Sequence, residues 1–236
     1  TINVPDTVGY ATPSDYLELL KKVYSELVPI CNKRTILVDC STVDVDSALH
    51  VAKESASRGL FAMDAPVSGG VVGAEKGTLT FMVGGDAEAY NKVEHFFGIM
   101  GQKSVLCGKS GAGQSAKICN NMILGISMIG VCESFNLAKK LNLNWERLYD
   151  VVSTSSGSCW SVNTYCPAPG IGPESPADRD YQPGFAADLM LKDLKLAKAA
   201  AESVDAPTAL GKLATEIYEN FLEKSKSFLN EYFYGF

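Results

Sequence analysis

The chain has 236 residues, of which 46% are apolar, and this is enough to bury one large core or two smaller ones. Its 27 acidic residues outnumber its 21 basic residues, which gives a net charge of −6. Such a balance provides no basic field for DNA, RNA or an anionic membrane, so we expect a globular protein with a small-molecule partner.

The first half of the chain alternates strand-like and helix-like segments, as expected for an α/β layer. A β-branched run at residues 35–41 predicts a strand, and Asp44 can cap a helix that ends at Gly59. The apolar residues of this helix recur at helical spacing: Val45, Leu49, Ala52 and Ala56.

Two further strands are predicted at residues 60–67 and 78–85. Asp86 can then cap a helix that runs to Gly101, and residues 104–107 predict the last strand of this region. The first half therefore predicts a sheet with at least two helices packed on it.

The second half predicts helices alone, the first of them from Gln114 to about Leu141. Three more are expected, at residues 144–152, 186–204 and 209–224. Between them, residues 156–185 are rich in Pro, Gly and Ser and form either a linker or a site-forming loop. Four aromatic residues favour the ordered loop: Trp160, Tyr165, Tyr181 and Phe185.

No metal site or disulfide framework is predicted. The seven cysteines are an odd number without a CxxC pair, so we expect free thiols in a reducing compartment. The two histidines, His50 and His95, lie in helical patterns without partner motifs, which argues against a zinc hydrolase or a histidine triad. The apolar run at residues 118–131 is interrupted by polar residues, and we expect no membrane span.

Residues 111–121, GAGQSAKICNN, admit two interpretations. Gly111, Gly113 and Ala116 fit a dinucleotide fingerprint, but such a unit must return to a second parallel strand, and here the helical pattern continues. The favoured interpretation places Lys117 and Asn121 on one helix face, where a lysine and an amide can hold a polar substrate. The alternative is that Lys117 is merely a solvated helix residue.

Two other segments are candidates for binding. Ser68, Gly69 and Gly70 follow a predicted strand, and their bare backbone N–H groups form either an anion cradle or an ordinary glycine turn. In FAADLMLKDL, Lys192 is either a ligand contact or the partner of Asp188 in a helix ion pair.

Five ordered motifs resemble 3-hydroxyisobutyrate dehydrogenase of the β-hydroxyacid dehydrogenase family: VDCST, DAPVSGGVVGAEKGTLTFMVGG, GKSGAGQSAKICNN, SSGSCWSVNTYCPAPG and FAADLMLKDLKLA. The resemblance implies an incomplete Rossmann-type α/β layer followed by an all-α domain like that of 6-phosphogluconate dehydrogenase. The implied boundaries are an atypical segment at 1–32, the C-terminal part of the NAD-binding domain at 33–110 and the all-α domain at 111–236.

The same resemblance implies a site for NAD-dependent oxidation of a small 3-hydroxy acid, with NADP also admitted as cofactor. It assigns proton transfer to Lys117 and binding of the substrate carboxylate to Ser68, Gly69 and Gly70. Further substrate contacts map onto Asn121, Trp160 and Phe185. Cofactor contacts map onto Thr42 and Lys192, with a supporting role for Asp193 at the cofactor site.

The family's GxGxxG turn and ribose-binding acidic residue are expected upstream of Thr35, where this sequence has neither. Residues 1–29 instead resemble a stretch of the 2-isopropylmalate synthase family. Three hypotheses follow: a working dehydrogenase, a non-catalytic truncated or chimeric product with an oligomerisation or binding role, and an acyltransferase. The last is disfavoured because the histidines that would bind its metal are missing.

The resemblance also implies the oligomeric state, the partners and the compartment of the protein. We expect a homo-oligomer that associates through the all-α domain, with no nucleic-acid or membrane partner. Relatives in the family place it in the mitochondrial matrix if the source is eukaryotic and in the cytoplasm if it is bacterial.

Overall fold

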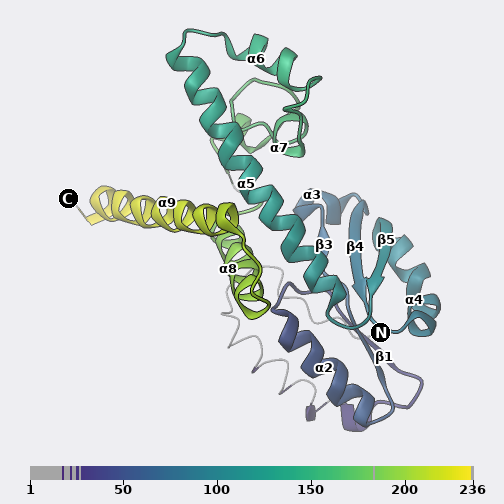
Figure 1. Cartoon of the computed structure of the whole chain (residues 1–236). Helices are drawn as coiled ribbons and strands as arrows, with labels where there is room; N and C mark the ends of the chain where they lie inside the picture. Colours follow the sequence, from purple (N-terminus) through teal and green to yellow (C-terminus); the bar gives the residue numbers. More distant parts are fainter. Residues whose placement is uncertain (1–17, 19–21, 23–24, 27, 183, 235–236) are drawn as a thin grey trace. The chain divides into compact units, whose positions relative to one another are not determined.

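The computed structural model describes residues 18, 22, 25–26, 28–182 and 184–234, with side chains described as far as residue 224. The chain divides into two compact units, Thr1–Cys119 and Asn120–Phe236 (Figure 1). The expected order, an α/β layer followed by an all-α part, is confirmed. The stretch that resembles an isopropylmalate synthase segment lies almost entirely outside the described residues.

The first unit contains a mixed five-stranded sheet. Its elements are η1 (Val28–Ile30), β1 (Ile36–Asp39), α2 (Val45–Ser57), β2 (Phe61–Asp64), β3 (Val67–Ser68), α3 (Gly70–Glu75), β4 (Leu79–Gly84), α4 (Ala87–Met100) and β5 (Gly101–Gly108). The strand pairs β1–β2 and β4–β5 are parallel, whereas β4 is antiparallel to both β2 and β3. Helix α4 packs along β5 (Figure 1), and α2 packs against β2.

Helix α2 begins where the sequence predicts, because the Asp44 carboxylate accepts the backbone N–H of Ser47 at 2.7 Å. Its buried face does not follow the apolar residues at helical spacing. Leu49 is 44% exposed, and the helix instead buries Ser47, Ala48, Val51 and Ser55. The small polar residues allow close packing on the sheet, and a search for large apolar side chains does not detect such a face.

Helix α4 joins the sheet through an aromatic core. Asp86 caps the helix by accepting the N–H of Ala89 at 2.9 Å, as predicted. The rings of Phe81 on β4 and Phe97 on α4 lie 4.9 Å apart, and both side chains are buried. This core supports the strand ends from which the site residues extend.

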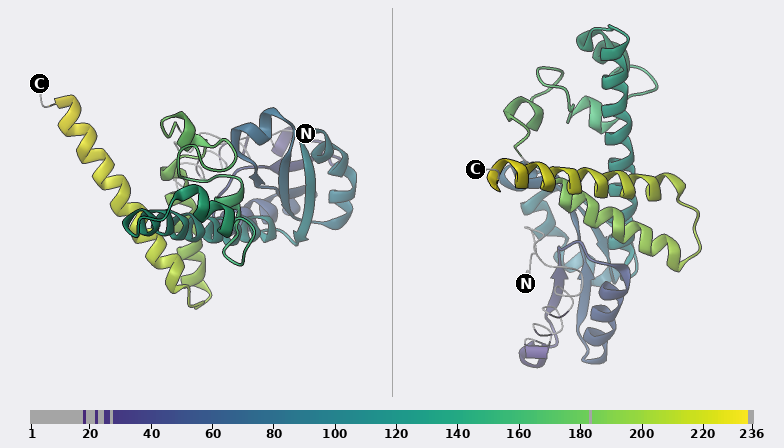
Figure 2. Two further views of the ribbon diagram at one scale, coloured as in Figure 1. Left: turned by 90° about the horizontal axis from the view of Figure 1, so that it is seen from above. Right: turned by 90° about the vertical axis from the view of Figure 1, so that its left-hand side faces the viewer.

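The second unit is helical in the part of the chain that the structure describes. It comprises most of α5 (Ala112–Lys140), then α6 (Trp145–Val152), α7 (Trp160–Asn163), η2 (Pro176–Arg179), α8 (Ala187–Ser203) and α9 (Ala209–Tyr234). Figure 2 shows α8 and α9 as neighbouring helices, and they pack against each other. Helix α9 continues past the predicted end at residue 224.

Helix α5 is apolar yet largely uncovered. By length and composition alone it could cross a membrane, although the core helix of a soluble protein passes the same test. Within the described chain only 28% of its most apolar window is buried. Ile123 is 68% exposed and Leu137 is 58% exposed. The helix therefore carries apolar surface that the described residues do not cover.

The loop between α6 and α8 is ordered, as its aromatic residues predict. Ser175 caps η2, and the Asp178 side chain completes a capping box by accepting the N–H of Ser175 at 2.8 Å. Asp178 also accepts the N–H of Gly170 at 2.6 Å. Two backbone segments are thus joined by one carboxylate, which is unlike a flexible linker.

Candidate active site

The first turn of α5 is held by a carboxylate from the sheet. Asp64, the last residue of β2, is buried, and its two oxygens accept the N–H groups of Gly111 at 2.7 Å and Gln114 at 2.9 Å. These are N–H groups that a helix leaves without an internal partner. Because Asp64 takes them, this turn is not available to a phosphate group.

Two glycines make this approach of helix and sheet possible. A Cβ atom at Gly113 would lie 2.4 Å from the carbonyl oxygen of Met82, and one at Gly84 would lie 2.5 Å from an Asp64 carboxylate oxygen. The GxG pattern at 111–113 therefore serves packing of α5 on the strands. Helix α5 continues to Lys140, and no strand follows it in the part of the chain that the structure describes, which agrees with rejecting the dinucleotide fingerprint.

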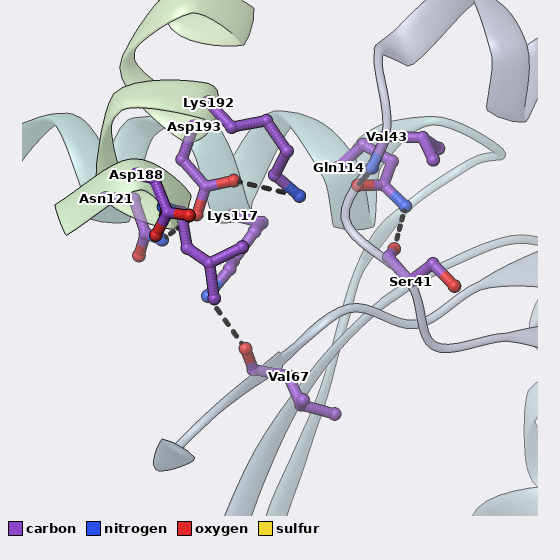
Figure 3. A network of polar contacts seen from close by, with 10 residues as sticks. Ser41, Val43, Val67, Gln114, Lys117, Asn121, Asp188, Lys192 and Asp193 are labelled. Atoms are coloured by element: carbon purple, nitrogen blue, oxygen red, sulfur yellow. Dashed lines mark hydrogen bonds and ion pairs between the residues drawn. The ribbon is translucent and has the colours of Figure 1, made fainter. Parts of the chain in front are cut away.

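Gln114 connects the start of α5 to the loop after β1. Its side chain is fully buried, its Oε1 accepts the N–H of Val43 at 3.1 Å, and its Nε2 donates to the carbonyl of Ser41 at 2.8 Å (Figure 3). Between these two residues lies Thr42, a predicted cofactor contact, which is partly exposed.

Lys117 lies one turn further along α5 and is only 7% exposed. Its Nζ donates to the carbonyl oxygen of Val67 at 2.8 Å (Figure 3). The interpretation of Lys117 as a solvated helix residue is therefore wrong. Buried lysines are rare, and their burial is a common feature of functional sites.

The carbonyl that holds Lys117 leads directly into the predicted carboxylate loop. Ser68 pairs with Thr80 of β4, which fixes the end of β3. Gly69 has φ 134° and Gly70 has φ 60°, values that favour glycine, and both residues are exposed. The structure thus brings Lys117 and the Ser68–Gly70 loop together within the first unit.

In the second unit, Asn121 is fully buried and its Nδ2 donates to the Asp193 carboxylate of α8. Asn120 donates to Asn121 Oδ1 at 2.9 Å. The second oxygen of Asp193 is buried and accepts no hydrogen bond from the described residues, but the Lys192 ammonium lies 3.4 Å from it (Figure 3). Three predicted site residues, Asn121, Lys192 and Asp193, therefore form one polar cluster.

The two predicted aromatic contacts are linked by a third aromatic residue, Tyr165. Its ring stacks on Trp160 with centroids 4.9 Å apart, and its hydroxyl accepts the N–H of Phe185 at 3.2 Å. Burial raises the pKa of Tyr165, so the hydroxyl stays protonated over the physiological range. Trp160 remains half-exposed, with a face open to solvent.

Sequence reasoning gave no role to Asp64, Gln114 or Tyr165. Asp64 and Gln114 lie inside motifs that the sequence analysis singled out, but only the fold shows which backbone groups they meet. Tyr165 was used as evidence of order in its loop. A tyrosine five residues after Trp160 gives no signal that the two rings stack.

In the part of the chain that the structure describes, no group of three or more His, Cys, Asp and Glu residues could hold a metal ion. The seven cysteines are free thiols. Burial, together with the neighbouring Asp39, raises the pKa of Cys40 to about 12, which makes it a poor nucleophile.

Two family models match the chain. One, described as the NAD-binding domain of 6-phosphogluconate dehydrogenase, matches residues 16–108 and so begins before Lys33. The other, described as NAD-binding of NADP-dependent 3-hydroxyisobutyrate dehydrogenase, matches residues 111–228.

Named relatives agree with these models. A probable 3-hydroxyisobutyrate dehydrogenase of Mycobacterium tuberculosis H37Rv is 43% identical over 204 residues, which are 86% of this chain and 69% of that protein. The mitochondrial 3-hydroxyisobutyrate dehydrogenase of Homo sapiens is 45% identical over 209 residues, 89% of this chain and 60% of that protein.

A solved structure is also similar. The Mycobacterium tuberculosis 3-hydroxyisobutyrate dehydrogenase with L-serine superposes with a TM-score of 0.83 at 42% identity, over 87% of this chain and 70% of that one.

Proposed function

The chain belongs to the 3-hydroxyisobutyrate dehydrogenase family, and on that premise we propose that it contributes to NAD-dependent oxidation of 3-hydroxyisobutyrate to methylmalonate semialdehyde, a reaction of valine catabolism. The observation that carries this proposal is the burial of Lys117 with its Nζ hydrogen-bonded to Val67, directly before the Ser68–Gly70 loop.

Lys117 is the proton-transfer group in this proposal. Bound NAD supplies the hydride acceptor. Lys117, as the neutral amine, accepts the proton of the substrate hydroxyl, while the backbone of Gly69 and Gly70 and the Ser68 side chain hold the substrate carboxylate. The Val67 carbonyl accepts a hydrogen bond from Nζ at 2.8 Å, which keeps the amine oriented during turnover.

The cofactor contacts are proposed at Thr42 and Lys192, with Asp193 in support. The loop of Thr42 fits this role because it follows a parallel strand, and dinucleotides bind outside the carboxyl ends of such strands. The first turn of α5 does not fit a pyrophosphate, because Asp64 accepts its N–H groups. NADP is an equally admissible cofactor, since one matching family is described as NADP-dependent.

The second unit is proposed to supply substrate contacts. Asn121 is held by Asp193, so its amide has a fixed orientation. Trp160 and Phe185 are held in one loop by Tyr165, which would let their apolar rings exclude water from a bound hydroxy acid. We place the domain boundary at residues 110–111, between the two family-model matches. Residues 1–32 are kept as a separate segment on their sequence alone, since the first family-model match already begins at residue 16.

The test is formation of NADH from 3-hydroxyisobutyrate by the chain alone and by the chain fused to a complete GxGxxG nucleotide-binding half. Turnover by the chain alone would mean that its own residues suffice, and turnover only after fusion would mean that it is an incomplete dehydrogenase. Absence of turnover in both forms, with NAD bound, would favour the alternative: a non-catalytic product with a binding or oligomerisation role.

A homo-oligomer is proposed through the helical unit, without nucleic acid or membrane. The exposed apolar residues of α5, among them Ile123 and Leu137, give the surface for it. Sedimentation that shows a monomer at micromolar concentration would exclude this association. The site of action is proposed as the mitochondrial matrix for a eukaryotic source, since the human relative is described as mitochondrial, and as the cytoplasm for a bacterial source.

A further inference from the structure

We propose that Gln114 is a positioning residue that joins the loop carrying Thr42 to the helix turn carrying Lys117. The inference rests on the proposed function, in which Thr42 contacts the cofactor and Lys117 moves the proton. Gln114 touches neither reactant, and it acts through the two segments that do.

The geometry of the Gln114 side chain supports this role. Its amide is fully buried, and it accepts from Val43 N and donates to Ser41 O, so one planar group holds the backbone on both sides of Thr42. Only a side chain with one acceptor and one donor at this spacing can make both bonds. Glutamate lacks the donor and methionine lacks both.

Side chains hold this loop at several points. Residues 40–44 belong to no helix or strand, so the backbone makes no strand ladder there. The Asp39 carboxylate accepts the N–H of Ser41 at 3.0 Å, and Gln114 adds the two bonds named above. Removing the Gln114 amide would leave Val43 N–H and Ser41 C=O without these partners.

The other end of the connection is equally fixed. Gln114 donates its own backbone N–H to Asp64, and Lys117 follows three residues later on the same helix. A shift of Gln114 therefore moves the turn that presents Lys117. Because hydride and proton leave the same substrate, an error of about 1 Å in their relative placement can cost on the order of 100-fold in rate.

The test compares Gln114→Met, which keeps the length of the side chain and removes both bonds, with Gln114→Glu, which keeps only the acceptor. Gln102→Met, at an exposed position on β5, is the matched control. The first readout is protection of the Val43 amide from hydrogen exchange. The second is the dissociation constant for NAD by calorimetry, and the third is kcat and KM in the form of the chain that turns over.

For Gln114→Met we expect at least about tenfold faster exchange at Val43, weaker NAD binding and a fall in kcat of about 10- to 100-fold, with little change in the KM for the hydroxy acid. Gln114→Glu should retain protection at Val43 and lose part of kcat. Gln102→Met should match the unsubstituted chain in all three.

Unchanged protection of Val43 in Gln114→Met would overturn the inference. The inference would also be overturned if Val43 exchanged faster in Gln114→Met while kcat and NAD affinity stayed unaltered. Failure of the unsubstituted chain to bind NAD in either form would instead overturn the proposed function, and the exchange of Val43 would still decide whether Gln114 holds the loop.

Discussion

Asp64 joins three elements through one side chain. It ends β2, caps α5 through Gly111 and Gln114, and fills the space that Gly84 and Gly113 leave open. An ionised carboxylate forms stronger hydrogen bonds with backbone N–H groups than a neutral side chain does, and Asp64 forms two of them. The position of Lys117 therefore depends on Asp64, although the two side chains have different functions.

Asp64→Asn should lower the free energy of unfolding by about 1–3 kcal/mol, because one oxygen becomes an NH2 group that faces a backbone N–H. Urea unfolding followed by circular dichroism measures this change. The control is Asp46→Asn, at an exposed position of α2, which should change the free energy by less than about 0.5 kcal/mol. Equal stabilities of the Asp64 variant and the control would contradict the account of the cap.

At this scale the sequence indicates candidate residues but not their surroundings. Spacing and family motifs point to Lys117, the Ser68–Gly70 loop and Asn121, and the roles of these residues stay predictions. Spacing left Lys117 open as a solvated residue, because burial depends on strands far away in the sequence. The partners of Lys117 and Gln114 lie 50 or more residues upstream, and periodicity contains no information on such contacts.

The start of a helix could be predicted where a capping side chain precedes it. Asp44, Asp86 and Asn144 each precede a helix, and each accepts a backbone N–H in the first turn. The buried face of α2 could not be read from the sequence, because its packing surface is built from alanine, valine and serine, whereas the large apolar Leu49 is exposed. The extent of α9 exceeded the prediction as well.

The Asp178 carboxylate holds the loop between α6 and α8 through hydrogen bonds. Hydrogen bonds from Gly170 and Ser175 lower the pKa of this carboxyl below its usual value. A lowered pKa means that the ionised form stabilises the folded loop at all pH values above the unfolded pKa of about 3.9, and that this contribution disappears as the pH falls through the folded pKa.

We therefore expect the protection of the Gly170 and Ser175 amides to be constant from pH 7 to about pH 4 and to fall below it. Hydrogen exchange, expressed as protection factors, measures this. In Asp178→Asn the dependence should vanish, because the side chain no longer titrates. Protection that stays constant down to pH 2.5 in the unsubstituted chain would contradict the role of ionised Asp178 in holding the loop.

The whole molecule combines a partial nucleotide-binding layer with a helical unit. The order of these two parts along the chain could be predicted from the change in the spacing of apolar residues near Gln114. The domain boundary at residues 110–111 stays a prediction. The compact units separate at Cys119–Asn120, inside α5, because one helix belongs to both. A boundary read from sequence falls at the start of such a helix, where the pattern changes, and packing divides it further along.

The central claim is that Lys117 is the proton-transfer group of a hydroxy acid dehydrogenase. The most direct test is kcat for NADH formation from 3-hydroxyisobutyrate with Lys117→Met, in whichever form of the chain turns over, beside Lys53→Met at an exposed position of α2. We predict a fall in kcat of about 100- to 10,000-fold for Lys117→Met, with the fold and NAD affinity retained, and no more than about a twofold change for Lys53→Met. Near-normal turnover by a folded Lys117→Met variant would contradict the claim.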